Sequence, residues 1–139
     1  MGKAAAVPAD SRSMNIIRMV SAVLLALPLI VFGGNYFVHV FEMPPGDGGA
    51  GYQLLQAMRS GGLMSAIAIS HIVAGVLLLI PRTQFLGGLL QLPMTIGIVA
   101  FHVTMMPAGL VTAVPMLLFN LGALANGPRL RALVEKTQS

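Results

Sequence analysis

Three histidines and several amide and hydroxyl side chains stand inside long uncharged stretches of this chain. Asn35 and His39 are four residues apart, so a helix would place them on one face. Gln91, Thr95 and His102 follow one another at steps of four and seven, which again predicts a shared face. Side chains of these types donate and accept hydrogen bonds, so they suit the polar head of an uncharged ligand.

His71 lies near the middle of its uncharged stretch and adjoins three small residues at helical spacing, Ala66, Ser70 and Ala74. Small residues allow two helices to approach closely, so we expect this stripe to face a neighbouring helix and His71 to point inward. A histidine at mid-membrane depth is a functional candidate by default. In its neutral form it could hydrogen-bond a quinone carbonyl or relay a proton.

The polar groups are predicted to occupy one half of the membrane. At 1.5 Å per residue, their depths below the outer boundary are ~3 Å for His39, ~5 Å for His102, ~9 Å for Asn35 and ~15 Å for His71. In the last uncharged segment Thr112 and Asn120 are eight residues apart and continue the inward polar pattern. One interpretation is an outward-opening polar pocket. The alternative is that the amides hold helices together and the shallow histidines face interfacial water.

Metal and haem binding are further alternatives. Imidazole and thioether groups together suit Cu(I), and such groups gather at the predicted outer end at His39, Met43, His102, Met105 and Met106. Because methionines in so apolar a chain mostly serve packing, we do not expect copper. His39 and His102 share a depth that bis-histidine haem requires, but the spacing is unspecific, so haem is not expected either. The chain has no cysteine, which excludes iron–sulfur ligation and thiolate zinc sites.

The composition defines the class of protein. Of 139 residues, 56% are hydrophobic and 9% are charged, whereas a soluble domain carries roughly 25% charged residues. A soluble globular or disordered protein is therefore excluded. The net charge is +4, but the cations stand at the ends of apolar stretches rather than in a patch, which argues against nucleic acid and for membrane lipids as partners.

Uncharged stretches of 23, 22 and 46 residues follow Arg18, Arg59 and Arg82. A membrane-spanning helix needs about 20 residues, so the last stretch must fold back once, best at 106–109, where proline and glycine supply a turn. The sequence predicts an all-α bundle of four transmembrane helices over 15–126, with tails at 1–14 and 127–139. The predicted helices are 15–41, 61–80, 84–105 and 108–126.

The cations predict the orientation in the membrane. An even number of helices places both termini on one side, and that side carries seven of the eight cations. Positive residues accumulate in cytoplasmic segments, so both termini should face the cytoplasm. The long outer loop 42–60 contains either a short amphipathic helix near its end or a plain surface loop.

Four short motifs resemble the DoxX-like family of membrane proteins: Phe-Gly-Gly-Asn-Tyr-Phe at 32–37, Ile-Val-Ala-Gly-Val-Leu-Leu-Leu-Ile-Pro-Arg at 72–82, Pro93 with Phe101-His102, and Pro-Ala-Gly-Leu at 107–110. The resemblance implies a four-helix bundle in the bacterial inner membrane. Some relatives are linked to thiosulfate–quinone oxidoreduction or to redox-defence complexes. It also implies Asn35 and His102 as site residues. The chain departs from the family pattern at Tyr36 (usually basic), His71 (usually acidic) and Gly97 (often polar).

Two hypotheses for the function follow. In the first, the protein is a quinone- or small-ligand-binding component associated with redox chemistry, with candidate ligand-binding residues Asn35, His71, Gln91, Thr95 and His102. In the second, it is a non-enzymatic accessory or assembly subunit of a larger membrane complex, and its partners are other membrane or redox subunits.

Overall fold

The computed structural model describes residues 9–42, 46 and 48–125. In this part of the chain all regular structure is helical, which confirms the predicted all-α class. Besides a short 3-10 turn, η1, at Pro107–Gly109, there are five helices: α1 (Ala9–Val38), α2 (Ala50–Ser60), α3 (Leu63–Leu79), α4 (Gln84–Thr104) and α5 (Leu110–Leu124).

Several of these helices are long and apolar enough to cross a membrane. Three segments meet this condition alone: Arg12–Val38, Gln84–Thr104 and Pro107–Leu124. Helices α2 and α3 meet it together, although they are bent by 85° at the break between them. The described residues therefore contain three segments that are long and apolar enough to span a membrane, or up to four if the bent pair forms one.

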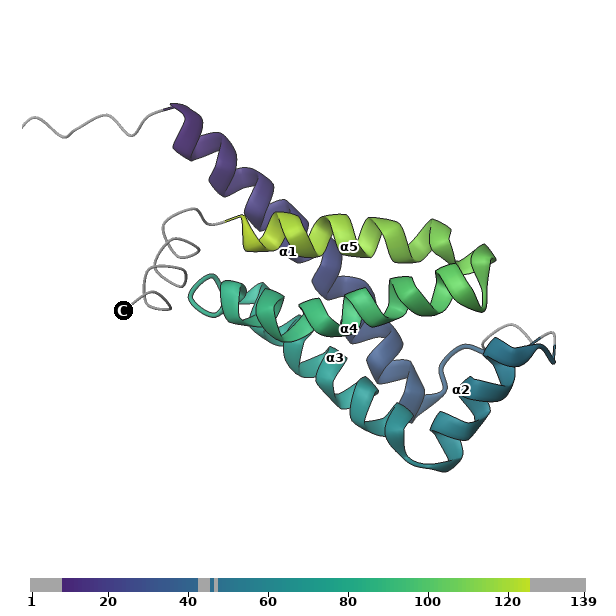
Figure 1. Cartoon of the computed structure of the whole chain (residues 1–139). Helices are drawn as coiled ribbons and strands as arrows, with labels where there is room; N and C mark the ends of the chain where they lie inside the picture. Colours follow the sequence, from purple (N-terminus) through teal and green to yellow (C-terminus); the bar gives the residue numbers. More distant parts are fainter. Residues whose placement is uncertain (1–8, 43–45, 47, 126–139) are drawn as a thin grey trace, which may run out of the picture.

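The long helices form a closed ring in which α1 packs on α3 and α5, and α4 packs on the same two helices. Figure 1 shows α4 and α5 side by side, with α1 crossing them at an angle. Helices α3 and α4 diverge from the turn that joins them, and α2 lies at the opposite end of the molecule. We call these two ends the turn end and the α2 end.

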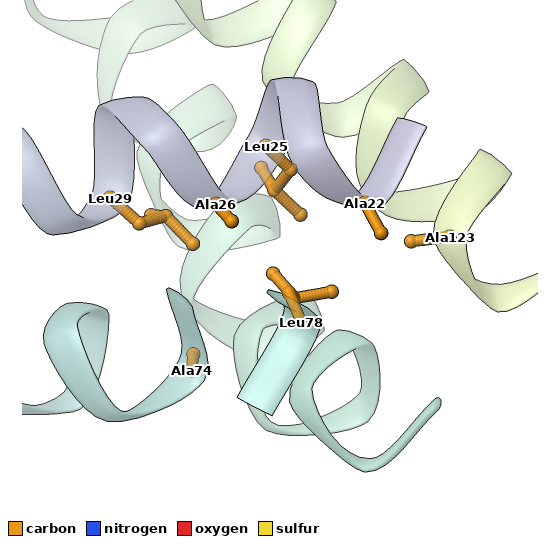
Figure 2. Close-up of a cluster of buried hydrophobic side chains, with 7 residues drawn as sticks. All are labelled: Ala22, Leu25, Ala26, Leu29, Ala74, Leu78 and Ala123. Carbon is orange, nitrogen blue, oxygen red and sulfur yellow. The ribbon is translucent and has the colours of Figure 1, made fainter. Parts of the chain in front are cut away.

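The apolar core lies where α1 crosses α3 and α5. Figure 2 shows its buried side chains, which come from α1 (Ala22, Leu25, Ala26, Leu29), α3 (Ala74, Leu78) and α5 (Ala123). The alanines at spacings of four on α1 let the partner helices approach closely, and the leucines fill the space between them. The alternation of small and large residues thus sets where α1 contacts α3 and α5.

Helix α1 ends at Val38, three residues before the predicted end at 41. The next residue, His39, has a positive φ of 51°, and its backbone N–H donates to the carbonyl of Asn35 at 2.9 Å. This left-handed residue closes the helix. The prediction that His39 shares a helix face with Asn35 is therefore wrong, because the chain has left the helix and the His39 side chain is exposed.

The outer loop predicted at 42–60 contains helix α2, so the helical alternative holds over Ala50–Ser60. The chain turns from α2 into α3 through Gly62, whose φ of 78° favours glycine. The beginning of α2 reaches the end of α4, since a methyl group built on Gly51 would lie 2.6 Å from the Cγ of Met106. Helix α2 therefore bridges the ends of α3 and α4 on the side where these helices diverge (Figure 1).

The small-residue stripe on α3 is buried at one end only. Ala74 is fully buried, Ser70 is half-buried and Ala66 is exposed. At the buried end of the stripe, α4 approaches α3 closely at Gly87, where a methyl group would lie 2.8 Å from the backbone nitrogen of Leu78 and 2.9 Å from the carbonyl oxygen of Ala74. The glycine lets α4 rest directly on the backbone of α3.

Candidate functional site

The most deeply buried polar side chains are two amides and a hydroxyl on α4 and α5. Gln91, Thr95 and Asn120 are each 0% exposed. Gln91 Nε2 donates to Thr95 Oγ1 at 3.3 Å, and Thr95 Oγ1 donates to the Gln91 carbonyl at 3.1 Å. This pairing leaves Gln91 Oε1 without a hydrogen bond, and both polar atoms of the Asn120 amide also have none within the described residues.

The packing of α4 on α5 places Gln91 level with Asn120. A methyl group built on Gly88 would lie 3.0 Å from Leu124 Cδ2 and 4.0 Å from Ala123 Cβ, so these positions face each other. Gln91 lies three residues after Gly88, and Asn120 lies three residues before Ala123. Because the two helices run in opposite directions, equal steps from the contact bring the two amides to the same height.

His71 reaches a similar height from α3. It lies seven residues before Leu78 and therefore on the same helix face, ~10.5 Å along the axis. Leu78 contacts Gly87 of α4, and Thr95 lies ~12 Å beyond that contact. The Cβ of His71 would lie 3.3 Å from a methyl group on Gly33 of α1, so the ring starts from the α1–α3 interface. Its Nε2 is buried and has no hydrogen-bond partner among the described residues.

We call His71, Gln91, Thr95 and Asn120 the polar cluster, because these four residues lie at similar heights along α3, α4 and α5. Within the described chain it holds four buried polar atoms without a partner: His71 Nε2, Gln91 Oε1, Asn120 Nδ2 and Asn120 Oδ1. Leaving a buried donor or acceptor unpaired costs about 1–3 kcal/mol. The Asn120 amide nitrogen is a donor, the two amide oxygens are acceptors, and the imidazole nitrogen serves as either according to its tautomer.

Asn35 has a different role in the structure. Its Nδ2 donates to the Phe41 carbonyl at 2.9 Å, and its Oδ1 accepts from the Phe41 backbone N–H at 3.0 Å. The amide thus binds both backbone groups of one residue and holds the chain that leaves α1. Among the alternatives that the sequence left open, these contacts favour a structural role for Asn35.

His102 also holds a turn. Its Nδ1 lies 3.0 Å from the Met106 carbonyl, and since a carbonyl can only accept, Nδ1 carries the proton. The ring stacks edge-on against Phe101 with centroids 5.3 Å apart, and it covers Gly109, where a methyl group would collide with the imidazole. His102 therefore fixes the connection from α4 through η1 to α5.

The residues of the copper alternative are distributed over two connections. His39 follows α1 and is exposed, and Met43 lies outside the described residues. Met105 is exposed and Met106 is half-buried against α2 near Gly51. Within the described part of the chain, no three His, Cys, Asp or Glu side chains are grouped as metal ligands.

Asn120 is the member of the polar cluster that the sequence prediction left out of its candidate site. The available signal was its spacing of eight residues from Thr112, but Thr112 is exposed in the structure. Tyr36, at a position where the family pattern has a basic residue, lies with its hydroxyl 3.1 Å from Ser65 Oγ and so connects α1 to α3.

Comparisons of the chain with protein-family models, with curated proteins and with solved structures find no match. The resemblance to the DoxX-like family therefore rests on the short motifs themselves. The structure assigns parts of these motifs to helix contacts. Gly33 faces the carbonyl of Ala68, and Gly75 faces the carbonyl of Ala26, at 2.8 Å and 3.2 Å from a built methyl group.

Proposed function

We propose that this chain is a DoxX-like, multi-pass protein of the bacterial inner membrane, with four spans and both termini in the cytoplasm. In this arrangement α3 is the fourth span, and α2, which is bent from it by 85°, lies along the outer surface. Three further segments of spanning length support this arrangement. The cations support the orientation, since seven of eight lie in the terminal segments, in the first half of α1 or in the α3–α4 turn.

Cysteine labelling tests the orientation in intact cells. The chain has no cysteine, so single cysteines at Ser11, Gly48 and Ser139 give an unambiguous signal. We expect a membrane-impermeant maleimide to label the Gly48 variant and to spare both terminal variants until the cells are opened. Labelling of the termini in intact cells would contradict the proposed orientation.

We further propose that the protein binds the polar head of an uncharged, lipid-soluble ligand such as a quinone, and that it serves redox chemistry. The observation that carries this proposal is the set of four unpaired, buried polar atoms in the polar cluster. The Asn120 amide N–H can donate to a quinone carbonyl. The oxygens of Gln91 and Asn120 can accept from the hydroxyls of the reduced form. The cluster thus offers hydrogen bonds to both redox forms.

The decisive experiment is measurement of bound quinone in protein purified in mild detergent, by extraction and mass spectrometry. We expect the parent protein to retain quinone and His71→Leu and Asn120→Leu to lose it. Asn15→Leu is the matched control, because it makes the same chemical change at an exposed position of α1. A parent protein without bound quinone, or variants that retain it, would contradict the proposal.

A second candidate function is that of an accessory subunit in a larger membrane complex. One observation favours it: Pro93, Gly97, Ala100 and Thr104 form an exposed stripe on α4, and a methyl group on Gly97 meets nothing within 4 Å. Small residues on a membrane helix suit close packing with another helix. If a partner helix binds here, Gly97→Leu should reduce the size of the complex in native gels without changing bound quinone. An unchanged size would count against this candidate.

A further inference from the structure

Arg18 is held by a hydrogen bond at the turn end of the molecule, where α3 and α4 are joined. Its Nε donates to Gln84 Oε1 at 3.2 Å, and Gln84 Nε2 donates in turn to the Leu78 carbonyl at 3.2 Å. Gln84 is only 5% exposed, so this chain of hydrogen bonds connects α1, α4 and α3. The Arg18 side chain is half-buried and has a defined place.

The position of Arg18 along α1 corresponds to a membrane boundary. From Val38, where α1 ends, to Arg18 the helix rises ~30 Å, which equals the thickness of the hydrocarbon core. The first turns of α1 extend beyond the other helices at this end (Figure 1). The α3–α4 turn lies in the same plane, because Gln84 at the start of α4 touches Arg18. With α1 crossing the membrane as proposed, the lipid phosphate groups lie next to this plane.

The charge at this boundary is not balanced by the described protein. The hydrogen bond to Gln84 uses Nε of Arg18, and in the described part of the chain the two terminal nitrogens make no further hydrogen bond. Arg82 is exposed in the turn, two residues before Gln84. Glu42 is the single acidic residue whose side chain the structure describes, and it lies beyond the opposite end of α1.

We propose that Arg18 and Arg82 form a binding site for the phosphodiester of an anionic membrane lipid. The planar guanidinium of Arg18 can donate two parallel hydrogen bonds to two phosphate oxygens. Gln84 holds that guanidinium in place, and Arg82 supplies the second positive charge. Basic groups between helices at a membrane surface bind anionic lipid head groups by this chemistry. The site depends on α1 crossing the membrane and does not involve the polar cluster.

Lipid titration of the purified full-length protein tests the proposal. The probes are phosphatidylglycerol, phosphatidylcholine and inorganic phosphate, and the readouts are the shift of the melting temperature and lipid binding by native mass spectrometry. We expect phosphatidylglycerol to stabilise the parent more than the other two probes do. Arg18→Gln should weaken phosphatidylglycerol binding by about five-fold, the factor expected from losing one basic residue near a membrane surface.

Two further variants make the test specific. Arg59→Gln removes the same charge from an exposed position of α2 and should leave phosphatidylglycerol binding unchanged. Arg82→Gln is exposed and should fold normally, so it decides the question if Arg18→Gln is too unstable to purify. The proposal is overturned if Arg82→Gln and every purifiable Arg18 variant bind phosphatidylglycerol like the parent. It is also overturned if phosphatidylcholine or inorganic phosphate stabilises the parent equally.

Discussion

Replacing Asn120 by leucine is expected to raise the free energy of unfolding of the ligand-free protein. Asn120 is 0% exposed, and neither its amide nitrogen nor its amide oxygen has a hydrogen-bond partner among the described residues. Leucine also has four side-chain heavy atoms that branch at Cγ, so it is the apolar residue nearest in shape to asparagine. The substitution removes two unpaired polar atoms from a buried site.

The magnitude follows from the cost of burying an unpaired polar group. That cost is about 1–3 kcal/mol, and hydrogen bonds between membrane helices lie near its lower end, since the unfolded chain in a membrane also finds partners. We therefore expect Asn120→Leu to be more stable than the parent by about 1 kcal/mol or more when both are free of ligand. If the polar cluster binds a quinone head, the same variant loses that ligand, so stability and binding change in opposite directions.

The assay is unfolding by titration with sodium dodecyl sulfate, followed by circular dichroism, on protein from which ligand has been washed. A decrease in stability of Asn120→Leu by about 1 kcal/mol would refute the reasoning, because it would mean that the amide is paired in the protein. The double variant with Gln91→Met identifies the partner. Non-additive effects of the two substitutions would indicate that Gln91 and Asn120 bond to each other across α4 and α5.

Four further predictions concern the backbone and the turns. Gly87→Ala should lower the free energy of unfolding by about 1–3 kcal/mol, since its methyl group would press on the α3 backbone at 2.8 Å. Gly97 faces open space, so Gly97→Ala should instead raise the free energy of unfolding by up to about 1 kcal/mol, because alanine favours the helix more than glycine does. Equal effects of the two variants would contradict the close packing at Gly87. His39→Gly should stabilise the protein by about 1 kcal/mol, because glycine adopts the observed φ of 51° without the steric cost that a Cβ brings. An unchanged melting temperature would argue against that conformation. Asn35→Ala should destabilise the protein by about 1–3 kcal/mol, because both backbone groups of Phe41 lose their hydrogen bonds. The amount of bound quinone should not change. A loss of quinone would mean that Asn35 belongs to the binding site.

Much of the fold could be predicted because the membrane imposes simple rules on the sequence. The all-α class follows from uncharged stretches of spanning length, since backbone groups in lipid must be satisfied within a helix. The break at 106–109 corresponds to η1, where proline and glycine interrupt the helix. The end of α1 and the position of α2 were less predictable, because they depend on the left-handed residue His39 and on the contact between Gly51 and Met106.

The candidate site was predictable only in part. Gln91 and Thr95 are buried as their spacing indicated, because helical periodicity alone places them on one face. Asn35 and His102 have the same polar character, yet their hydrogen bonds go to nearby backbone groups. Periodicity cannot separate these cases, since it says which face a side chain occupies and not which atom it meets.

The sequence by itself determined the class of protein and the residues that could do chemistry, because composition, charge and spacing are properties of the chain. Only the tertiary structure decided which polar atoms remain without partners. The pairing of Asn35 with Phe41 depends on how α1 ends, and the alignment of Gln91 with Asn120 depends on how closely α4 and α5 pack at Gly88. Hydrogen bonds require specific atoms within about 3 Å. That condition is set by how a helix ends and by how helices that are distant in the sequence pack together.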